Sequence, residues 1–160
     1  MRHTLVAATA VFLGIATGAA PAPAQAPAGE TVAQIAVVNE LFNAMRAGDS
    51  ARVRAVFHPQ MKSMMSSDVG PDGQARVQVT PVDGFVRMIG TPHGEVYDER
   101  LFNPRTLIDG TLASVWVDYS FYLGTKFLHC GVDVFHLAKV GEVWKIVALT
   151  DTRRTTGCTR

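Results

Sequence analysis

Three consecutive long strand patterns near the C-terminus constrain the fold most. They cover residues 111–124, 126–140 and 143–152, and the two-residue turns Gly124-Thr125 and Gly141-Glu142 separate them. A glycine followed by another residue is typical of tight turns that join antiparallel strands. Strands of this length are more than twice the usual ~5–6 residues, and their accumulated twist coils a sheet. The sequence therefore predicts a curled antiparallel sheet with a concave face.

The pairing of the first two strands predicts which side chains share a face. If Leu123 lies opposite Lys126, then Trp116 faces Asp133 and Ser120 faces His129. Cross-strand neighbours share a face. One face then carries a mixed set of aromatic and polar residues: Trp116, Asp118, Ser120, Tyr122, His129 and Asp133. The other carries a nearly apolar set: Val115, Val117, Tyr119, Phe121, Cys130, Val132 and Val134. The mixed face is our predicted ligand pocket, although a three-residue turn would exchange the faces.

Helices and shorter strands are predicted before this sheet. Apolar residues at helical spacing, including Val32, Ile35, Phe42 and Met45, predict a helix over residues 30–47, and Gly48 closes it. A second helix is expected to begin after the capping residue Asp49 and to end near residue 57, and a hairpin follows over residues 60–67 and 74–80. A third helix is expected over residues 82–89. A long strand should then cover residues 95–108, with a bulge or edge position at Asn103-Pro104. This order predicts a single α+β domain over residues 31–160, with N-terminal helices packed over the concave face.

The first 24 residues have the pattern of a signal peptide. Arg2 and His3 precede an apolar segment over residues 5–15, and Ala22-Pro23-Ala24 fits a cleavage site. Residues 25–30 would then form a disordered leader. We expect an exported protein, periplasmic or secreted, with no membrane insertion after the signal is removed.

Charge and motif content exclude several classes of partner. The whole chain has 15 basic and 14 acidic residues, and removal of Arg2 with the signal leaves a formal charge of zero. A neutral chain gives no reason to expect nucleic acid or an anionic membrane as partner. No pattern predicts a metal site or a cofactor.

Two cysteines, Cys130 and Cys158, remain after the signal. In an oxidising compartment a disulfide between them is the favoured interpretation. It would tie the C-terminal tail to the middle strand. The alternative is a buried free Cys130 and a reactive, exposed Cys158.

The chemical hypothesis for the mixed face is a carboxylate–imidazole pair. Asp118 would lie diagonally from His129, and Asp133 would lie close by. A pocket carboxylate beside Trp116 could act as a general base, with His129 relaying the proton. The alternative is a buried polar network that satisfies itself without chemistry. Arg153 could reach an anionic ligand at the pocket mouth, although a solvated or salt-bridged position is the more ordinary role.

Several segments together resemble the nuclear transport factor 2-like superfamily of cone-shaped α+β domains. They are similar in particular to the bacterial proteins described as putative lumazine-binding or polyketide-cyclase-like (SnoaL-like). The segments that carry the likeness are Ala47-Gly48-Asp49, Ile108-Asp109-Gly110, residues 113–121, residues 129–135, Trp144-Lys145-Ile146 and residues 151–154.

The resemblance implies a cavity between the concave sheet and the helices, lined by Trp116, Asp118, His129 and Asp133. It also implies a homodimer formed through the sheet. The superfamily includes isomerases, dehydratases, cyclases, transport adaptors and members with no known chemistry, so the fold alone does not choose a reaction. We expect an exported domain that binds a small, partly apolar organic molecule. The alternatives are an isomerase-, dehydratase- or cyclase-type enzyme using Asp118, His129 and Asp133, and a non-catalytic interaction domain.

Overall fold

A computed structural model describes residues 28–159, so the expected signal peptide and the first half of the expected leader lie outside the described residues. The described chain folds into three helices and six strands: α1 (Ala28–Arg46), α2 (Ser50–Val56), β1 (Ser63–Val69), β2 (Ala75–Pro81), α3 (Val82–Gly90), β3 (Tyr97–Asp109), β4 (Leu112–Leu123), β5 (Lys126–Val140) and β6 (Val143–Arg153). Every element expected from the sequence is present, with ends displaced by three residues or fewer. The first helix begins at Ala28, two residues earlier than predicted.

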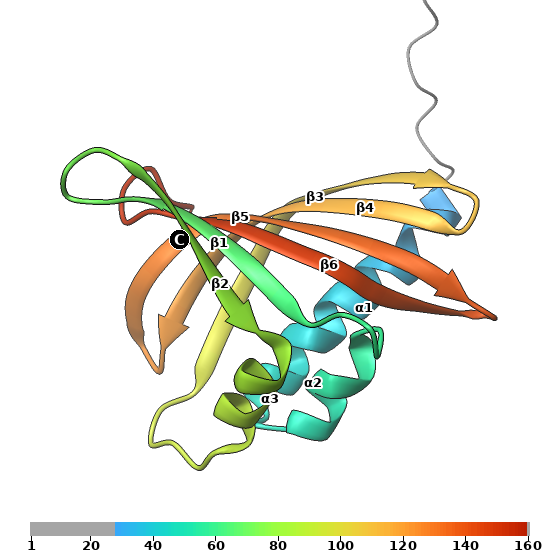
Figure 1. Ribbon diagram of the computed structural model, residues 1–160, viewed down its shortest axis with the longest axis horizontal. Coiled ribbons are helices and arrows are strands. Elements are labelled where there is room, and N and C mark those ends of the chain that lie inside the picture. The colour runs from blue at the N-terminus through green and yellow to red at the C-terminus, as the bar shows by residue number, and fades with distance from the viewer. Residues whose placement is uncertain (1–27, 160) are drawn as a thin grey trace, which may run out of the picture.

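The strands form one curled sheet in the order β2-β1-β6-β5-β4-β3. All neighbouring strands are antiparallel except β1 and β6, which run parallel. The three helices lie on one side of the sheet, beneath its concave face (Figure 1). The expected α+β architecture is therefore confirmed. β3 lies at the edge of the sheet, and its register shifts between Phe102 and Arg105, at the predicted Asn103-Pro104 interruption.

Local residues determine where the helices begin and end. Gly48 has φ +66°, a left-handed conformation that follows the end of α1. The Asp49 side chain accepts a 3.0 Å hydrogen bond from the Arg52 amide and so caps α2. The predicted apolar stripe of α1 is partly wrong, because Val32 is exposed. Its buried side instead contains Gln34, Val38, Leu41, Phe42 and Met45.

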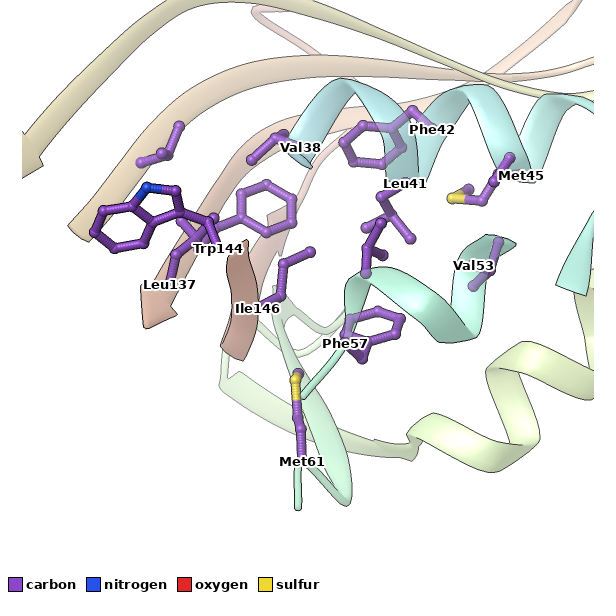
Figure 2. Packing of buried hydrophobic residues seen from close by; sticks show 14 of the residues in the cluster. Val38, Leu41, Phe42, Met45, Val53, Phe57, Met61, Leu137, Trp144 and Ile146 are labelled. Carbon is purple, nitrogen blue, oxygen red and sulfur yellow. The ribbon is translucent and has the colours of Figure 1, made fainter. Parts of the chain in front are cut away.

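The hydrophobic core lies between α1, α2 and the adjoining parts of β5 and β6 (Figure 2). Leu137 of β5 and Ile146 of β6 are fully buried. Ile146 lies toward Leu41 of α1 and Phe57, which follows α2, and Leu137 lies beside Trp144 (Figure 2). Trp144 also packs in this cluster, as the sequence predicts. Burial of such side chains stabilises the fold by roughly 1.5–3 kcal/mol each. The core joins the helices to one part of the concave face and leaves another part free for a cavity.

The predicted register of β4 and β5 is wrong beyond their turn. Leu123 does pair with Lys126, but a bulge follows, and Phe121 pairs with His129. An extra residue on one strand moves every later partner by one position, so the later side chains of that strand change faces relative to the other. Trp116 therefore lies opposite Val134 and not opposite Asp133. As a result, His129 and Asp133 share the concave face with Tyr119 and Phe121, whereas Trp116, Asp118 and Ser120 share the convex face.

The predicted disulfide between Cys130 and Cys158 is present, with a Cα–Cα separation of 5.7 Å. The backbones of Cys130 and Arg154 also pair, through hydrogen bonds of 2.8 and 2.9 Å. The C-terminal tail is thereby held against the convex face of β5. Within residues 28–159, none of the helices combines the length and the apolar character needed to cross a bilayer.

Candidate functional site

A cavity of about 340 Å³ lies between the concave face of the sheet, α1 and α3. All six strands and both helices contribute side chains to it. The lining residues are Leu41, Phe42, Met45, Met64, Ser66, Thr80, Phe85, Met88, Ile89, Tyr97, Glu99, Phe121, Asp133, Leu149, Asp151 and Arg153. A cavity of this size is in the range that holds small organic ligands.

One side of the cavity is apolar. Leu41, Phe42 and Met45 come from α1, on the side that also faces the core (Figure 2). Phe85 and Ile89 come from α3, four residues apart, so that both lie on one face of that helix. Aromatic and methionine side chains provide a wall that adapts to an apolar ligand of variable shape.

The sheet side carries three carboxyl groups from three different strands: Glu99 of β3, Asp133 of β5 and Asp151 of β6. Asp133 and Asp151 are directly opposite each other in the β5–β6 register. Glu99 reaches the same place from β3, where it pairs with Phe121 of β4. Side chains of paired residues project from the same face, so the register brings all three carboxyl groups to the concave surface.

Burial raises the pKa values of two of these carboxyl groups. Asp133 is 3% exposed, and one of its oxygens, Oδ2, has no hydrogen-bond partner. Burial raises the pKa of Asp133 well above its usual range, and the neighbouring Glu99 carboxylate raises it further. Burial also raises the pKa of Glu99 to about 7, although the hydrogen bond with Asp133 lowers it. The two carboxyl groups therefore behave as one pair that retains a proton after Glu99 ionises.

Asp151 forms an ion pair with Arg153, two residues further along β6. The Arg153 guanidinium Nη2 donates to Asp151 Oδ2 at 3.2 Å and to Ser66 Oγ at 3.0 Å. Asp151 Oδ1 is buried and has no hydrogen-bond partner. Arg153 is the one cationic side chain among the described residues that line the cavity, and it is already hydrogen-bonded to Asp151 and Ser66.

A second polar group lies beside the carboxyl pair. The Tyr119 hydroxyl donates to the Thr152 carbonyl at 3.0 Å, and the His129 Nδ1 atom lies 3.1 Å from the same hydroxyl. The His129 ring stacks on Phe121, with ring centroids 5.2 Å apart. Burial lowers the pKa of His129, and the Arg153 charge lowers it further, so the imidazole is neutral. Burial also raises the pKa of Tyr119, which keeps its proton.

The structure does not bring the six predicted pocket residues together. Only Asp133 lines the cavity. Trp116 is 45% exposed on the convex face, with the Arg105 guanidinium 5.7 Å from its ring centroid. Asp118 is also on that face, where it accepts a 3.1 Å hydrogen bond from the Asn103 side chain. The expected Asp118–His129 pair is therefore wrong, because the two residues belong to opposite faces of the sheet.

The other three predicted residues have structural partners. Ser120 is buried under the C-terminal tail and donates to the Thr159 carbonyl. Tyr122 packs against Phe127 and carries the Arg100 guanidinium 4.1 Å from its ring centroid. His129 is on the concave face but does not line the cavity; it contacts Phe121, which does, and Tyr119, which does not.

The sequence interpretation did not place Glu99 or Asp151 in the site. A signal for both exists in the alternation of strand residues, since Tyr97, Glu99 and Leu101 fall on one side of β3 and Leu149, Asp151 and Arg153 fall on one side of β6. That alternation shows which residues share a face. It does not show that the two faces converge on one cavity, because this depends on the register of the intervening strands.

The arrangement provides proton donors and acceptors at the end of a partly apolar cavity. A carboxyl pair that keeps one proton near neutral pH can donate one hydrogen bond and accept another, or transfer a proton. The described residues contain no cluster of three or more histidine, cysteine or acidic side chains arranged to hold a metal ion.

Solved structures with the same fold have distant sequences. An NTF2-like protein of unknown function from Shewanella baltica aligns with a TM-score of 0.60 at 21% identity, over 83% of this chain and all of that chain. A protein of unknown function from Mycobacterium tuberculosis aligns with a TM-score of 0.60 at 14% identity, over 78% of this chain and 72% of that chain. A putative dehydratase from the NTF2-like family of Streptomyces avermitilis aligns with a TM-score of 0.58 at 12% identity, over 82% of this chain and all of that chain.

At these identities the structural matches establish the fold alone. A comparison with curated proteins gives no significant match. The family model described as putative lumazine-binding matches residues 29–150, which cover most of the described domain. The chain therefore belongs to the putative lumazine-binding family and has the NTF2-like fold that its sequence resembles.

Proposed function

We propose that this protein binds a small, partly apolar organic molecule in the cavity between α1, α3 and the concave sheet. The observation that carries the proposal is the composition of that cavity: an apolar wall with a carboxyl group at its floor that is buried and has an unpartnered oxygen. A buried polar atom without a partner is costly in a finished fold, and a ligand that supplies a hydrogen bond removes that cost. The family's description as lumazine-binding supports a small-molecule ligand.

The test is native mass spectrometry of the protein isolated from its own host without reduction. We expect a co-purifying molecule of defined mass on the wild-type protein. A matched pair of variants locates it. Met64 lines the cavity, and its neighbour Met65 projects from the convex face of the same strand and is 47% exposed. M64W should fill the cavity and abolish the bound mass, whereas M65W should keep it. Retention of the mass in M64W would refute the cavity as the binding site.

A second candidate is an enzyme of the isomerase, dehydratase or cyclase type. The observation that favours it is the proton shared by Glu99 and Asp133, because a carboxyl group that ionises near pH 7 is suited to general acid–base catalysis. In this version Glu99, which ionises first, is the base, and Asp133, which keeps its proton, is the acid. The sequence suggested Asp118 or Asp133 as the base and His129 as its partner. A catalyst should lose turnover in D133N while retaining affinity, and a binding protein should change only in affinity.

The third candidate is an interaction domain without a small-molecule ligand. Such a domain would have its cavity filled by its own side chains. The open volume of about 340 Å³ favours the two ligand-based functions over this one.

We also propose that the protein is exported to the periplasm or secreted. The signal-like pattern of residues 1–24 and the Cys130–Cys158 disulfide support this location, since disulfides persist in oxidising compartments. Cell fractionation with detection of the mature N-terminus tests it. Full-length protein in the cytoplasm would contradict it.

A homodimer formed through the convex face is a further part of the proposal. One row across five strands of that face contains Val79, Met65, Thr150, Val134 and Trp116. Of its four apolar residues, all but Val134 are largely exposed. A row of exposed apolar side chains marks an interaction surface. Sedimentation velocity should give a dimer mass for the wild-type protein and a monomer mass for W116E. Monomers at all concentrations of the wild-type protein would refute it.

A further inference from the structure

We propose that the cavity selects an amphipathic organic amine, whose protonated nitrogen contacts Asp133 and Glu99 while its apolar body lies against α1 and α3. This inference rests on the proposed function and names the class of ligand for the same cavity. Three features of the site favour a cation over a neutral or anionic ligand.

The first feature is the surplus of hydrogen-bond acceptors. Asp133 Oδ2 and Asp151 Oδ1 are both buried without a partner, and both residues line the cavity. Asp133 itself is 3% exposed. An ammonium group donates three hydrogen bonds and accepts none. It therefore complements a floor whose unsatisfied atoms are carboxylate oxygens better than a hydroxyl or a carbonyl does.

The second feature is the charge of the floor. The Arg153 guanidinium is already hydrogen-bonded to Asp151 and Ser66, so it balances the charge of Asp151. Above pH 7 the Glu99–Asp133 pair keeps one proton and one negative charge. No further cation among the described lining residues balances that charge. A ligand cation would balance it, whereas a ligand carboxylate would add a second uncompensated charge.

The third feature is the shape of the opposite wall. The cavity is bounded on the helix side by apolar side chains alone, including Phe42, Phe85 and Ile89. A small inorganic cation would leave this surface without a partner. An amine with an aromatic or aliphatic body of moderate size uses both the charged floor and the apolar wall.

The groups that surround the pair predict how binding depends on pH. Asp151 and Arg153 face it from β6, Tyr119 from β4, and His129 lies behind Tyr119 on β5. Tyr119 and His129 are both neutral at neutral pH, and Arg153 and Asp151 balance each other. The group that changes charge near neutral pH is therefore Glu99. When it is protonated below pH 7 the pair becomes neutral, and the attraction for a cation is lost.

The experiment uses three probes of nearly equal shape, measured by isothermal titration calorimetry on the full exported protein. They are naphthylmethylamine, naphthylmethanol and naphthoate, which present a cation, a neutral hydroxyl and an anion on the same ring system. At pH 8 we expect the amine to bind at least about tenfold more tightly than the alcohol, and the naphthoate to bind weakest. Between pH 8 and pH 6 the amine should lose about tenfold in affinity as Glu99 gains its proton, and the alcohol should not change.

Variants assign the effect to the floor. E99Q should remove the preference for the amine over the alcohol, leave alcohol affinity within about twofold and abolish the pH dependence, because Glu99 carries the negative charge of the pair. E99A serves the same purpose if E99Q does not fold. D133N replaces a protonated carboxyl group with a neutral amide, so it should keep the preference for the amine. D118N is the matched control, because Asp118 lies on the convex face and should leave all three affinities unchanged.

The outcomes separate this inference from the proposed function. Equal binding of amine and alcohol, or tighter binding of naphthoate, would overturn the amine inference while keeping the cavity as a binding site. An amine preference that persists in E99Q would also overturn it. Absence of binding by all three probes, together with a wild-type protein that carries no co-purified molecule, would overturn both.

Discussion

Substitution of Glu99 by glutamine should make the protein more stable at pH 8 and leave its stability nearly unchanged at pH 5. The carboxyl group of Glu99 has a usual pKa of 4.5, and burial beside Asp133 raises it to about 7 in the folded protein. The folded state therefore binds more protons than the unfolded state between these two values. Stability is then fully present below about pH 4.5 and decreases as the pH rises through 7.

The magnitude follows from the size of the shift. Each pKa unit corresponds to about 1.36 kcal/mol, so a shift from 4.5 to about 7 corresponds to roughly 3 kcal/mol of stability lost on raising the pH from 4.5 to 8. Asp133 adds to this effect with the same sign, because the Glu99 charge helps to raise its pKa. E99Q removes the contribution of Glu99 and the part of the Asp133 contribution that the Glu99 charge causes, and should therefore reduce the decrease.

The assay is urea unfolding of wild-type protein and E99Q at pH 5, 6, 7 and 8, followed by circular dichroism. Subtraction of the two pH profiles cancels the contributions of all other titrating groups. E142Q is the matched control, since the Glu142 side chain is 93% exposed. If the wild-type and E99Q profiles run parallel from pH 5 to pH 8, the account of a buried carboxyl pair is refuted.

Three further changes test the packing around the site. Replacement of Cys158 by serine opens a loop of 28 residues and should lower the free energy of unfolding by about 3–4 kcal/mol, and reduction of the wild-type protein should reproduce this loss in urea unfolding. Alanine at Gly131 would place a Cβ against the β6 backbone and should destabilise the fold by about 1–3 kcal/mol. Alanine at Gly94, which has free space around it, is the control and should not destabilise the fold. Equal melting temperatures of the two variants would contradict the close approach at Gly131. Alanine at Phe135, which is fully buried, should destabilise by about 3–5 kcal/mol in chemical unfolding, and a loss below 1 kcal/mol would contradict its place in the core.

The sequence predicts the elements of this fold well because their signals are local. Gly124 and Gly141 both have positive φ angles at the turns that separate β4, β5 and β6, as their Gly-X pattern indicates. Gly48 and Asp49 likewise mark the boundary between α1 and α2 through conformation and capping. The disulfide between the two remaining cysteines is also confirmed.

The site could be predicted only in part, because it depends on strand register. A single bulge between the Phe121–His129 and Tyr122–Phe127 pairs moves Asp133 to the face opposite Trp116. Nothing in the local sequence marks that bulge with a glycine or proline. Asp133 was therefore predicted as a pocket residue with the wrong neighbours.

Glu99 and Asp151 show a different reason for failure. Their functional environment comes from strands that are far apart in the sequence, since Glu99 is on β3 and Asp151 is on β6. The curl of the sheet brings both to one cavity. No periodicity within either strand contains that information.

The central claim is that the cavity is a ligand-binding site, and methionine methyl NMR tests it most directly. Met45, Met64 and Met88 line the cavity, whereas Met65 projects from the opposite face of the sheet. With carbon-13 labels on the methionine methyl groups, titration with naphthylmethylamine at pH 8 should shift the three cavity signals and leave the Met65 signal in place. Shifts confined to Met65, or no shift in any of the four signals at millimolar probe, would contradict the claim.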